Sequence, residues 1–110
     1  MIKEYDKNNV FHKIIHGQLS CKKVYESDSV LAFHDINPIS KIHVLVIPKK
    51  EYINYSDFIS NAQKDEIANF FIEVHRIATE DLKLDDYKLV TNCGAKSGQV
   101  VFHFHVHIIA

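Results

Sequence analysis

The last eight residues of the chain read His103-Phe104-His105-Val106-His107-Ile108-Ile109-Ala110. Alternation of polar and apolar residues with a period of two is typical of a β-strand with one buried face. Because positions i, i+2 and i+4 of a strand share a face, the three imidazoles are expected on one face, about 6.6 Å apart. Phe104, Val106 and Ile108 are then expected on the opposite face, in the core. The stretch therefore predicts a site built on a rigid strand.

This row of imidazoles is open to three interpretations. A histidine-rich strand without chemistry would still require a partner or water for each imidazole. Neutral imidazole is a good metal ligand, but His103 and His107 lie about 13 Å apart on an ideal strand, which strains coordination of one ion. In the third interpretation one imidazole is a nucleophile and its neighbours orient it or carry protons. The third fits the spacing best, and no metal ligands are predicted.

The seven residues 103–109 fit completely the pattern His-φ-His-φ-His-φ-φ, where φ is apolar, and in this the chain resembles the histidine triad (HIT) superfamily. Within it, the chain looks most like the Hint-type branch, the purine nucleoside phosphoramidases. The resemblance covers nearly the whole chain, and upstream it rests on the blocks Val10-Phe11, Leu31–Ile36, Pro38, His43–Lys49 and Asn92–Gln99.

The composition is that of one globular domain over residues 1–110, with 46% hydrophobic and 25% charged residues. The 13 basic and 14 acidic residues give no excess charge for nucleic acid or an anionic membrane. Cys21 and Cys93 have neither metal-ligand spacing nor a disulfide framework, which favours free thiols. Without a signal peptide or an apolar run of 18 residues, the protein is expected to be cytoplasmic.

The hydrophobic pattern predicts an α+β fold. The continuous aliphatic run 41–47 favours a central strand that is buried on both faces. A connector is expected over 51–58 and a loop over 93–99. The resemblance implies that the strands form one five-stranded antiparallel sheet, and that the chain dimerises into a ten-stranded sheet. The expected elements are a short helix over 10–16, a long helix over 60–82, and strands over 22–26, 29–36, 41–47, 87–92 and 103–109.

The resemblance also implies a role for each catalytic histidine. His105 would be the nucleophile, and a cationic His107, with His103 and His43 behind it, would stabilise charge on the phosphate. From the residues alone, a lone histidine in an apolar strand such as His43 is more often a satisfied core residue. Both interpretations of His43 give it a supporting position behind the reacting groups.

The nucleotide site is implied in the same way. One wall of the base pocket would comprise Val10, Phe11 and Ile14, and the purine would lie between Phe33, His34 and Ile36. Asp35 would accept hydrogen bonds from both ribose hydroxyls, although before Asn37-Pro38 it could equally be a turn residue. The phosphate and leaving group would be surrounded by Asn92, Gly98 and Gln99, in a loop whose glycines could offer backbone N–H groups to an anion.

The chain departs from the family pattern at two places. Many bacterial relatives carry two cysteines, half of a structural zinc site, where this chain has Asn9 and His12. Because asparagine is a poor zinc ligand, no structural zinc is expected, and no cofactor is required. Where Hint relatives carry a serine next to the glutamine, this chain has Val100, so the resemblance does not determine its leaving-group preference.

The sequence therefore predicts a hydrolase that cleaves nucleoside 5′-phosphoramidates, or related nucleotide P–N or P–O bonds, through a nucleotidyl-histidine. Its expected partners are a purine nucleotide and a second copy of the chain, but neither nucleic acid nor a membrane. Three alternatives stay open: a nucleotidyl transferase, a nucleotide-binding regulatory module with little turnover, and a metal-binding protein.

Overall fold

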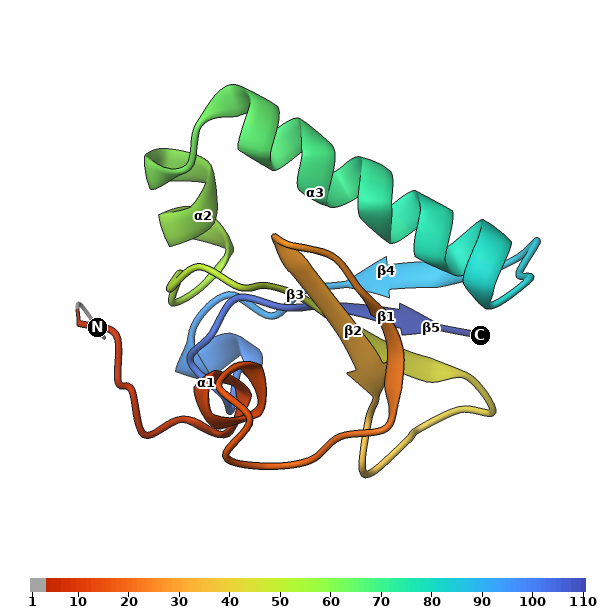
Figure 1. The fold of residues 1–110 in the computed structure, drawn as a ribbon, viewed down its shortest axis with the longest axis horizontal. Coiled ribbons are helices and arrows are strands. Elements are labelled where there is room, and N and C mark those ends of the chain that lie inside the picture. Colours follow the sequence, from red (N-terminus) through yellow and green to blue (C-terminus); the bar gives the residue numbers. More distant parts are fainter. Residues whose placement is uncertain (1–3) are drawn as a thin grey trace.

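The computed structural model describes residues 4–110, which form one antiparallel sheet with helices on both faces (Figure 1). The α+β architecture with five strands is the one the sequence predicts. In chain order the elements are α1 (Val10–Ile15), β1 (Lys23–Glu26), β2 (Val30–His34), β3 (His43–Pro48), α2 (Tyr55–Asn61), α3 (Lys64–Arg76), the π-helical turn η1 (Ile77–Asp81), β4 (Lys88–Val90), the 3₁₀ turn η2 (Ala95–Ser97) and β5 (Val106–Ile109).

The strand order is β1-β2-β3-β5-β4, and every neighbouring pair is antiparallel. All six residues of β3 are buried, as its continuous aliphatic run predicts. β3 lies between β2 and β5, and its register with β5 pairs Leu45 with His107. β5, which contains His107, is therefore an inner strand that pairs with β3 on one side and β4 on the other.

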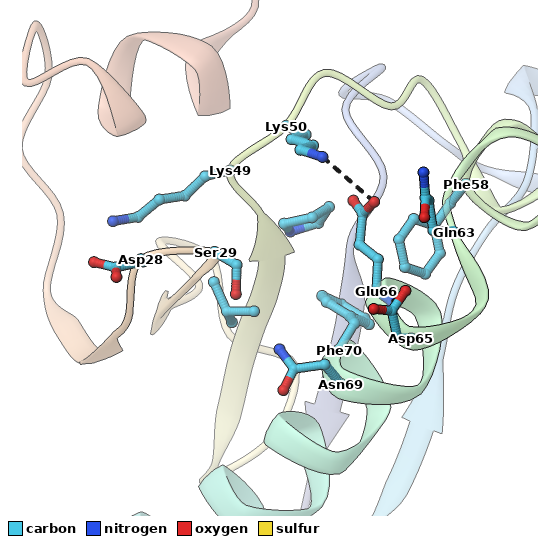
Figure 2. Close-up of a pocket in the computed structure, with 12 residues that line it drawn as sticks. Asp28, Ser29, Lys49, Lys50, Phe58, Gln63, Asp65, Glu66, Asn69 and Phe70 are labelled. Atoms are coloured by element: carbon cyan, nitrogen blue, oxygen red, sulfur yellow. Dashed lines mark hydrogen bonds and ion pairs between the residues drawn. The ribbon is translucent and has the colours of Figure 1, made fainter.

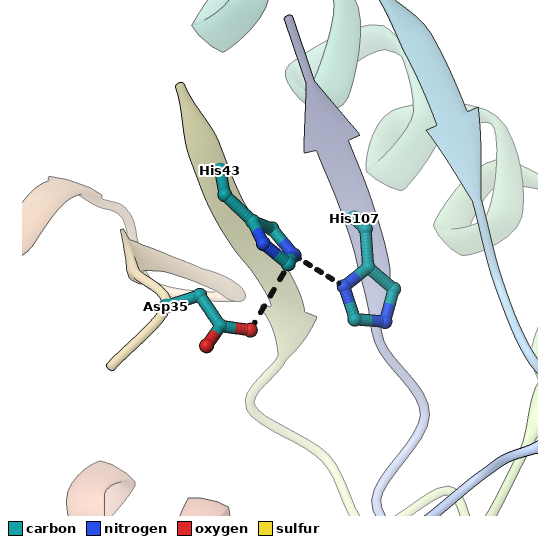
Figure 3. Close-up of side chains that lie close together, drawn as sticks. All are labelled: Asp35, His43 and His107. Carbon is teal, nitrogen blue, oxygen red and sulfur yellow. Dashed lines mark hydrogen bonds and ion pairs between the residues drawn. The ribbon is translucent and has the colours of Figure 1, made fainter. Parts of the chain in front are cut away.

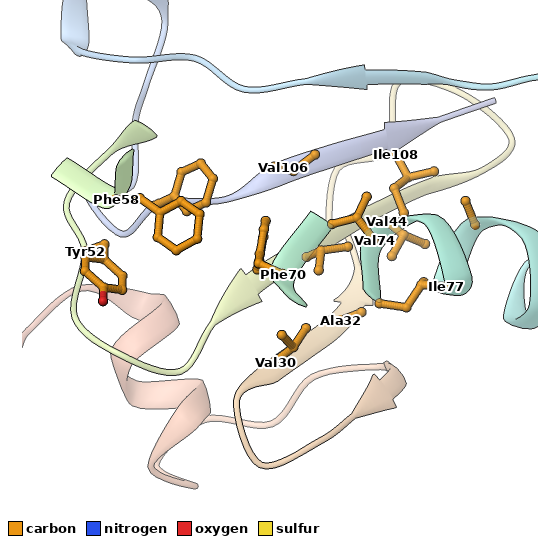
Figure 4. Packing of buried hydrophobic residues seen from close by; sticks show 13 residues of the cluster. Val30, Ala32, Val44, Tyr52, Phe58, Phe70, Val74, Ile77, Val106 and Ile108 are labelled. Atoms are coloured by element: carbon orange, nitrogen blue, oxygen red, sulfur yellow. The ribbon is translucent and has the colours of Figure 1, made fainter. Parts of the chain in front are cut away.

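Each face of the sheet has its own apolar cluster, because alternate residues of a strand point to opposite faces. The larger cluster lies between the sheet and α3 (Figure 4). The smaller one lies on the side of α1 and contains Phe11, Leu31, Phe33, Leu45 and Ile47. The histidines of the C-terminal stretch face this second side, so α1 lies over the candidate site.

The long helix expected over 60–82 is in fact two helices. Ala62 and Gln63 have extended backbone, with φ near −75° and ψ near 155°, and they separate α2 from α3. The prediction of a connector over 51–58 was also wrong, because α2 begins at Tyr55. The Asn54 side chain accepts a hydrogen bond from the Asp57 N–H at 2.8 Å, which caps the start of this helix. This capping pattern is the local signal for α2 that hydrophobic periodicity does not contain.

The histidine stretch also differs from the expected strand 103–109, because β5 begins only at Val106. The β3 ladder ends at the pair Val46–Val106, and the Phe104 N–H instead donates to the Tyr52 carbonyl at 2.7 Å. The predicted alternation of faces nevertheless persists through the irregular part: Phe104 packs in the α3 cluster, and His105 contacts Phe11 on the other side. Among residues 4–110, no helix has the length and apolar character needed to cross a membrane.

Candidate active site

Two histidines of the triad come together on the α1 side of the sheet. The ring centroids of His105 and His107 are 5.1 Å apart, and Phe11 meets the His105 ring edge-on at 5.0 Å. His105 is 7% exposed, so only a small part of its ring is accessible. The structure thus places both residues as the strand alternation predicts, with one apolar wall supplied by α1.

His43 lies between Asp35 and His107 (Figure 3), and its hydrogen bonds fix which ring nitrogens of His43 and His107 carry a proton. The Ile39 N–H donates to His43 Nδ1 at 3.2 Å, so the proton of neutral His43 is on Nε2. His43 Nε2 lies 2.8 Å from His107 Nδ1 and therefore donates to it. His107 must then carry its own proton on Nε2. The β3 histidine is thus the positioning residue that sets the tautomer of His107.

The His107 Nε2 atom is buried and has no hydrogen-bond partner within the described part of the chain. A buried N–H group without a partner costs about 1–3 kcal/mol, so such groups are rare in folded proteins. A proton donor held in this way is suited to an oxygen atom of a bound ligand. The arrangement provides the hydrogen-bond donor of the site.

His105 has the opposite arrangement. Its Nδ1–H donates to the His103 carbonyl at 2.6 Å, which leaves an unprotonated Nε2 with a free electron pair. Burial lowers the pKa of His105 below its ordinary value of 6.5, so the ring is neutral at pH 7. A neutral imidazole with a fixed tautomer is a competent nucleophile.

The resemblance implies a cationic His107 in the reaction, and the free protein has this residue in its neutral form. Burial, with smaller contributions from His105 and His43, lowers the pKa of His107 to about 4. At pH 7 the free protein therefore presents a neutral N–H donor at this position rather than an imidazolium. The site combines one unprotonated ring nitrogen, on His105, with one neutral N–H donor, on His107, on a single face of the sheet.

His103 does not lie behind His107 either. Its ring is fully buried, its Nε2–H donates to the Pro48 carbonyl at 2.7 Å, and its Nδ1 lies 2.5 Å from Tyr5 Oη. Burial lowers the pKa of His103 to about 4, so this ring is also neutral. His103 contacts the reactive pair through its backbone carbonyl, which orients His105, and not through its imidazole.

Asp35 lies beside His43, and both of its carboxylate oxygens have neighbours within the chain. Oδ1 accepts the Asn37 N–H at 2.8 Å, as expected for a turn residue, and Oδ2 is 3.4 Å from His43 Nε2. Asp35, His43 and His107 have potential metal-ligand atoms within 4.8 Å of one another. A metal there would have to displace the proton shared by the two histidines, so the hydrogen-bonded arrangement fits these residues better.

The expected base-binding residues are only partly brought together. Phe11 and Phe33 are buried and meet edge-on at 5.5 Å, with Ile14 packed against their cluster. Val10 and Ile36 are exposed, the latter at 91%. Alternation along β2 places His34 on the face of Ala32, opposite to Phe33, so these two do not form one stack.

The loop expected to surround the phosphate is held mainly by its own hydrogen bonds. Gln99 is buried. Its side-chain N–H donates to the Ile53 carbonyl and its side-chain oxygen accepts the Gly94 N–H, each at 2.8 Å. The backbone N–H groups of Gly98 and Gln99 donate to Ala95 and Gly94 carbonyls inside the loop. The side chain of Gln99 and these two N–H groups are therefore structural rather than available for an anion. Asn92 is half-buried, and the Gly98 backbone, at φ +97°, lies beside its side chain.

The zinc site of bacterial relatives does not fit this chain. The Asn9 side-chain oxygen accepts the His12 N–H at 2.9 Å and caps α1, and its amide donates to the Asp6 carbonyl at 2.7 Å, in the segment before the helix. His12 Nδ1 lies 3.8 Å from a Glu51 carboxylate oxygen. Asn9 thus forms a helix cap and His12 lies beside a carboxylate, an arrangement that does not resemble a metal-ligand pair.

Sequence reasoning missed two residues that hold the triad backbone and rings. Thr91 donates its hydroxyl to the His105 carbonyl at 2.8 Å, and Tyr5 contacts His103. Strand alternation could place Thr91 near the triad only with the β4–β5 register, which a single sequence does not contain. Tyr5 belongs to no periodic pattern.

The structure also contains a cavity of about 560 Å³, on the other side of the sheet (Figure 2). It lies between the ends of β2 and β3 and the start of α3, and Phe58 and Phe70 of the larger core cluster line it. Its charged groups are in part neutralised by one another, as in the contact of 3.5 Å between Lys50 and Glu66. No triad histidine is among its described lining residues, so it is separate from the candidate active site.

Comparisons with known proteins agree with this geometry. The chain is 54% identical over 106 residues to an uncharacterised HIT-like protein of Rickettsia prowazekii, covering 96% of the chain and 88% of that protein. A HIT family hydrolase from Clostridium thermocellum superposes with a TM-score of 0.78 at 38% identity, covering 94% and 90% of the two chains. A histidine triad nucleotide-binding protein from Candida albicans gives 0.80 at 32% identity, covering 92% and 73%. The model of the HIT domain matches residues 16–110, and the chain therefore belongs to the HIT domain family.

Proposed function

We propose that this protein is a Hint-type hydrolase that cleaves purine nucleoside 5′-phosphoramidates, or related nucleotide esters, through a nucleotidyl-histidine intermediate. The observation that carries the proposal is the pairing of tautomers on one face of β5. His105 presents an unprotonated Nε2, and His107 presents a buried N–H without a partner. A tetrahedral phosphorus with its anionic oxygens matches one nucleophile beside one donor.

In the first step the electron pair of His105 Nε2 attacks the phosphorus and forms a P–N bond. The bond between phosphorus and the leaving amine breaks, and the amine departs with a proton from solvent. His107 Nε2–H donates to a non-bridging oxygen, where negative charge grows in the transition state. The His103 carbonyl holds the Nδ1 proton of His105 throughout and stabilises the positive charge of the nucleotidylated ring.

In the second step water attacks the same phosphorus. The P–N bond to His105 breaks and its electron pair returns to Nε2, while the proton of the attacking water goes to solvent. The products are a nucleoside monophosphate and the free enzyme. Splitting one displacement into two lowers each barrier, and every part of the scheme uses imidazole and backbone groups. No cofactor is required.

The base would bind against the apolar wall on the α1 side. Phe11 packs edge-on against Phe33. Val10 precedes Phe11 in the chain and Ile36 follows Phe33 by three residues, and both offer exposed apolar surface. The ribose hydroxyls would compete with His43 for the carboxylate of Asp35, which is partly accessible. The similar fold of the Candida nucleotide-binding protein supports a nucleotide ligand for this site, and that of the Clostridium hydrolase supports a hydrolytic reaction.

We also propose that the protein acts as a homodimer, through the outer surface of α3 and the edge strand β4. Ile72 on α3 is 66% exposed and Leu89 on β4 is 48% exposed. β4 ends the sheet, so its outer backbone groups are open to pairing with a second copy.

A second function is favoured by Val100, which is 83% exposed where Hint relatives carry a hydroxyl. Without that hydroxyl, the protein would bind a nucleoside monophosphate and turn over little. Steady-state release of AMP from adenosine 5′-phosphoramidate decides between the two functions. AMP release by the wild type that is lost in His105→Asn supports the hydrolase. His75→Asn is the control, because His75 is an exposed residue of α3, and it is expected to keep the activity. Saturable AMP binding with no AMP release from substrate would favour the binding module.

A further inference from the structure

The N-terminal segment is linked to the triad strand by one side-chain contact across 98 positions of the sequence. Tyr5 Oη lies 2.5 Å from His103 Nδ1, and the two rings meet edge-on with centroids 5.5 Å apart. Tyr5 precedes α1 and is half-buried, whereas His103 is fully buried. The contact is therefore a hydrogen bond shielded from water on its histidine side.

The direction of this bond follows from the other end of the ring. His103 Nε2 is 2.7 Å from the Pro48 carbonyl, which can only accept, so the proton of neutral His103 is on Nε2. Nδ1 is then an acceptor, and the Tyr5 hydroxyl donates to it. Burial raises the pKa of Tyr5, which keeps the hydroxyl protonated as a donor. The His103 ring is thus tied between the N-terminal segment and the end of β3.

We propose that Tyr5 is a positioning residue of the active site, which directs the nucleophile through His103. This inference rests on the proposed function. Tyr5 and Pro48 fix the His103 ring, and the same residue's carbonyl accepts the Nδ1 proton of His105 at 2.6 Å. That bond sets both the tautomer of His105 and the direction of its Nε2. A looser His103 would misalign the attacking electron pair without removing any group that touches substrate.

The surroundings of Tyr5 support a dedicated contact. Its ring lies 5.7 Å from that of His12, and Asn9, Asp6 and Glu51 are its polar neighbours. The Asn9 side-chain oxygen caps α1, and a Glu51 carboxylate oxygen lies 3.8 Å from His12 Nδ1. The hydrogen bond from Tyr5 thus attaches the segment before α1 to the sheet at the position where the relatives' zinc pair is replaced by Asn9 and His12.

The test compares Tyr5→Phe with Tyr52→Phe, a matched control that also loses a hydroxyl hydrogen bond. Tyr52 Oη donates to Glu66 of α3 at 2.7 Å, and the substitution keeps the Tyr52 backbone carbonyl that accepts the Phe104 N–H. Imidazole nitrogen NMR of the resting proteins reports on His103 without any substrate. In Tyr5→Phe we expect the His103 Nδ1 resonance to shift toward the value of an unprotonated imidazole nitrogen that accepts no hydrogen bond. In Tyr52→Phe we expect it to stay at the wild-type value. An unchanged resonance would overturn the contact, whether or not the protein is a hydrolase.

Kinetics then test the positioning role. Loss of one hydrogen bond is expected to lower kcat of Tyr5→Phe by about 2- to 10-fold, with KM within twofold of wild type. Tyr52→Phe is expected to keep both constants. A rise in KM with unchanged kcat, or equal losses in both variants, would contradict the role. If wild type forms no product at all, the proposed function fails and the kinetic role with it, whereas the NMR result still decides the contact.

Discussion

His43 on β3 and His107 on β5 are joined by a hydrogen bond of 2.8 Å between Nε2 and Nδ1. Since the Ile39 N–H occupies the other nitrogen of His43, the bond runs from His43 to His107. It decides that the free group of His107 is a donor, beside the acceptor nitrogen of His105. The chemistry of the site follows from this one relationship.

Replacing His43 by Ala removes the donor that fixes His107. The His107 proton is then free to occupy Nδ1, which turns the donor at Nε2 into an acceptor that repels phosphate oxygens. We expect kcat to fall by about 10²-fold, because loss of one transition-state donor has an effect of that size. Steady-state kinetics check this result, with His75→Ala as the control at an exposed site. Unchanged kcat in His43→Ala would show that the bond does not matter.

The pH dependence of activity should report the buried nucleophile. Burial lowers the pKa of His105 below 6.5, and protonation at Nε2 abolishes its nucleophilicity. Activity is therefore expected to be full above pH 6.5 and to fall only as the pH drops through the lower pKa of the folded protein. A profile of kcat/KM between about pH 5 and pH 8 measures how activity falls on the acid side. A midpoint above 6.5 would contradict the assignment.

Stability should depend on pH in the same range. The pKa of buried His103 is about 4 in the folded protein, against 6.5 for an ordinary histidine. The unfolded chain then binds more protons between these values, so the free energy of unfolding falls as the pH falls from 6.5 toward 4. For His103 the full loss is about 3 kcal/mol.

Urea unfolding at a series of pH values measures this loss. His103→Asn lacks the buried imidazole, so its free energy of unfolding should vary less with pH than that of wild type. Equal pH dependence in the two proteins would show that His103 is not held neutral by burial.

Metal removal should leave the protein unaffected. The Asn9 side chain caps α1, and the His43–His107 hydrogen bond occupies the nitrogens that a metal would need. We expect EDTA treatment and dialysis to change neither Tm nor the rate of AMP release. Stoichiometric zinc by elemental analysis, with activity lost on chelation and restored by zinc, would contradict this prediction.

The sequence alone was sufficient to predict the faces of the sheet. Residue type reflects whether a position is buried. Burial therefore explains both the period-two alternation around Phe104 and His105 and the unbroken aliphatic run in β3. The sequence could not predict where β5 begins, nor the break between helices α2 and α3 at Ala62. A strand end depends on which partner residues remain to pair with, and the helix break depends on backbone conformation at two residues without a Pro or Gly signal.

The site was predictable to a similar extent. A shared face for His105 and His107 follows from their spacing, but the contacts of the His103 ring, with Pro48 and with Tyr5 98 residues earlier, are tertiary. Gln99 illustrates the opposite error. A polar residue in a glycine loop suggests ligand binding, yet its amide holds the loop to Ile53. Whether a polar group is free or already occupied is decided by tertiary contacts.

The central claim is that His105 becomes covalently nucleotidylated. The most direct measurement is intact-mass analysis after mixing the protein with adenosine 5′-phosphoramidate and quenching in base, followed by peptide mapping. The account predicts a transient adenylyl adduct located on His105 in wild type and in His75→Asn, and none in His105→Asn. AMP release without any adduct, or an adduct on another residue, would contradict it.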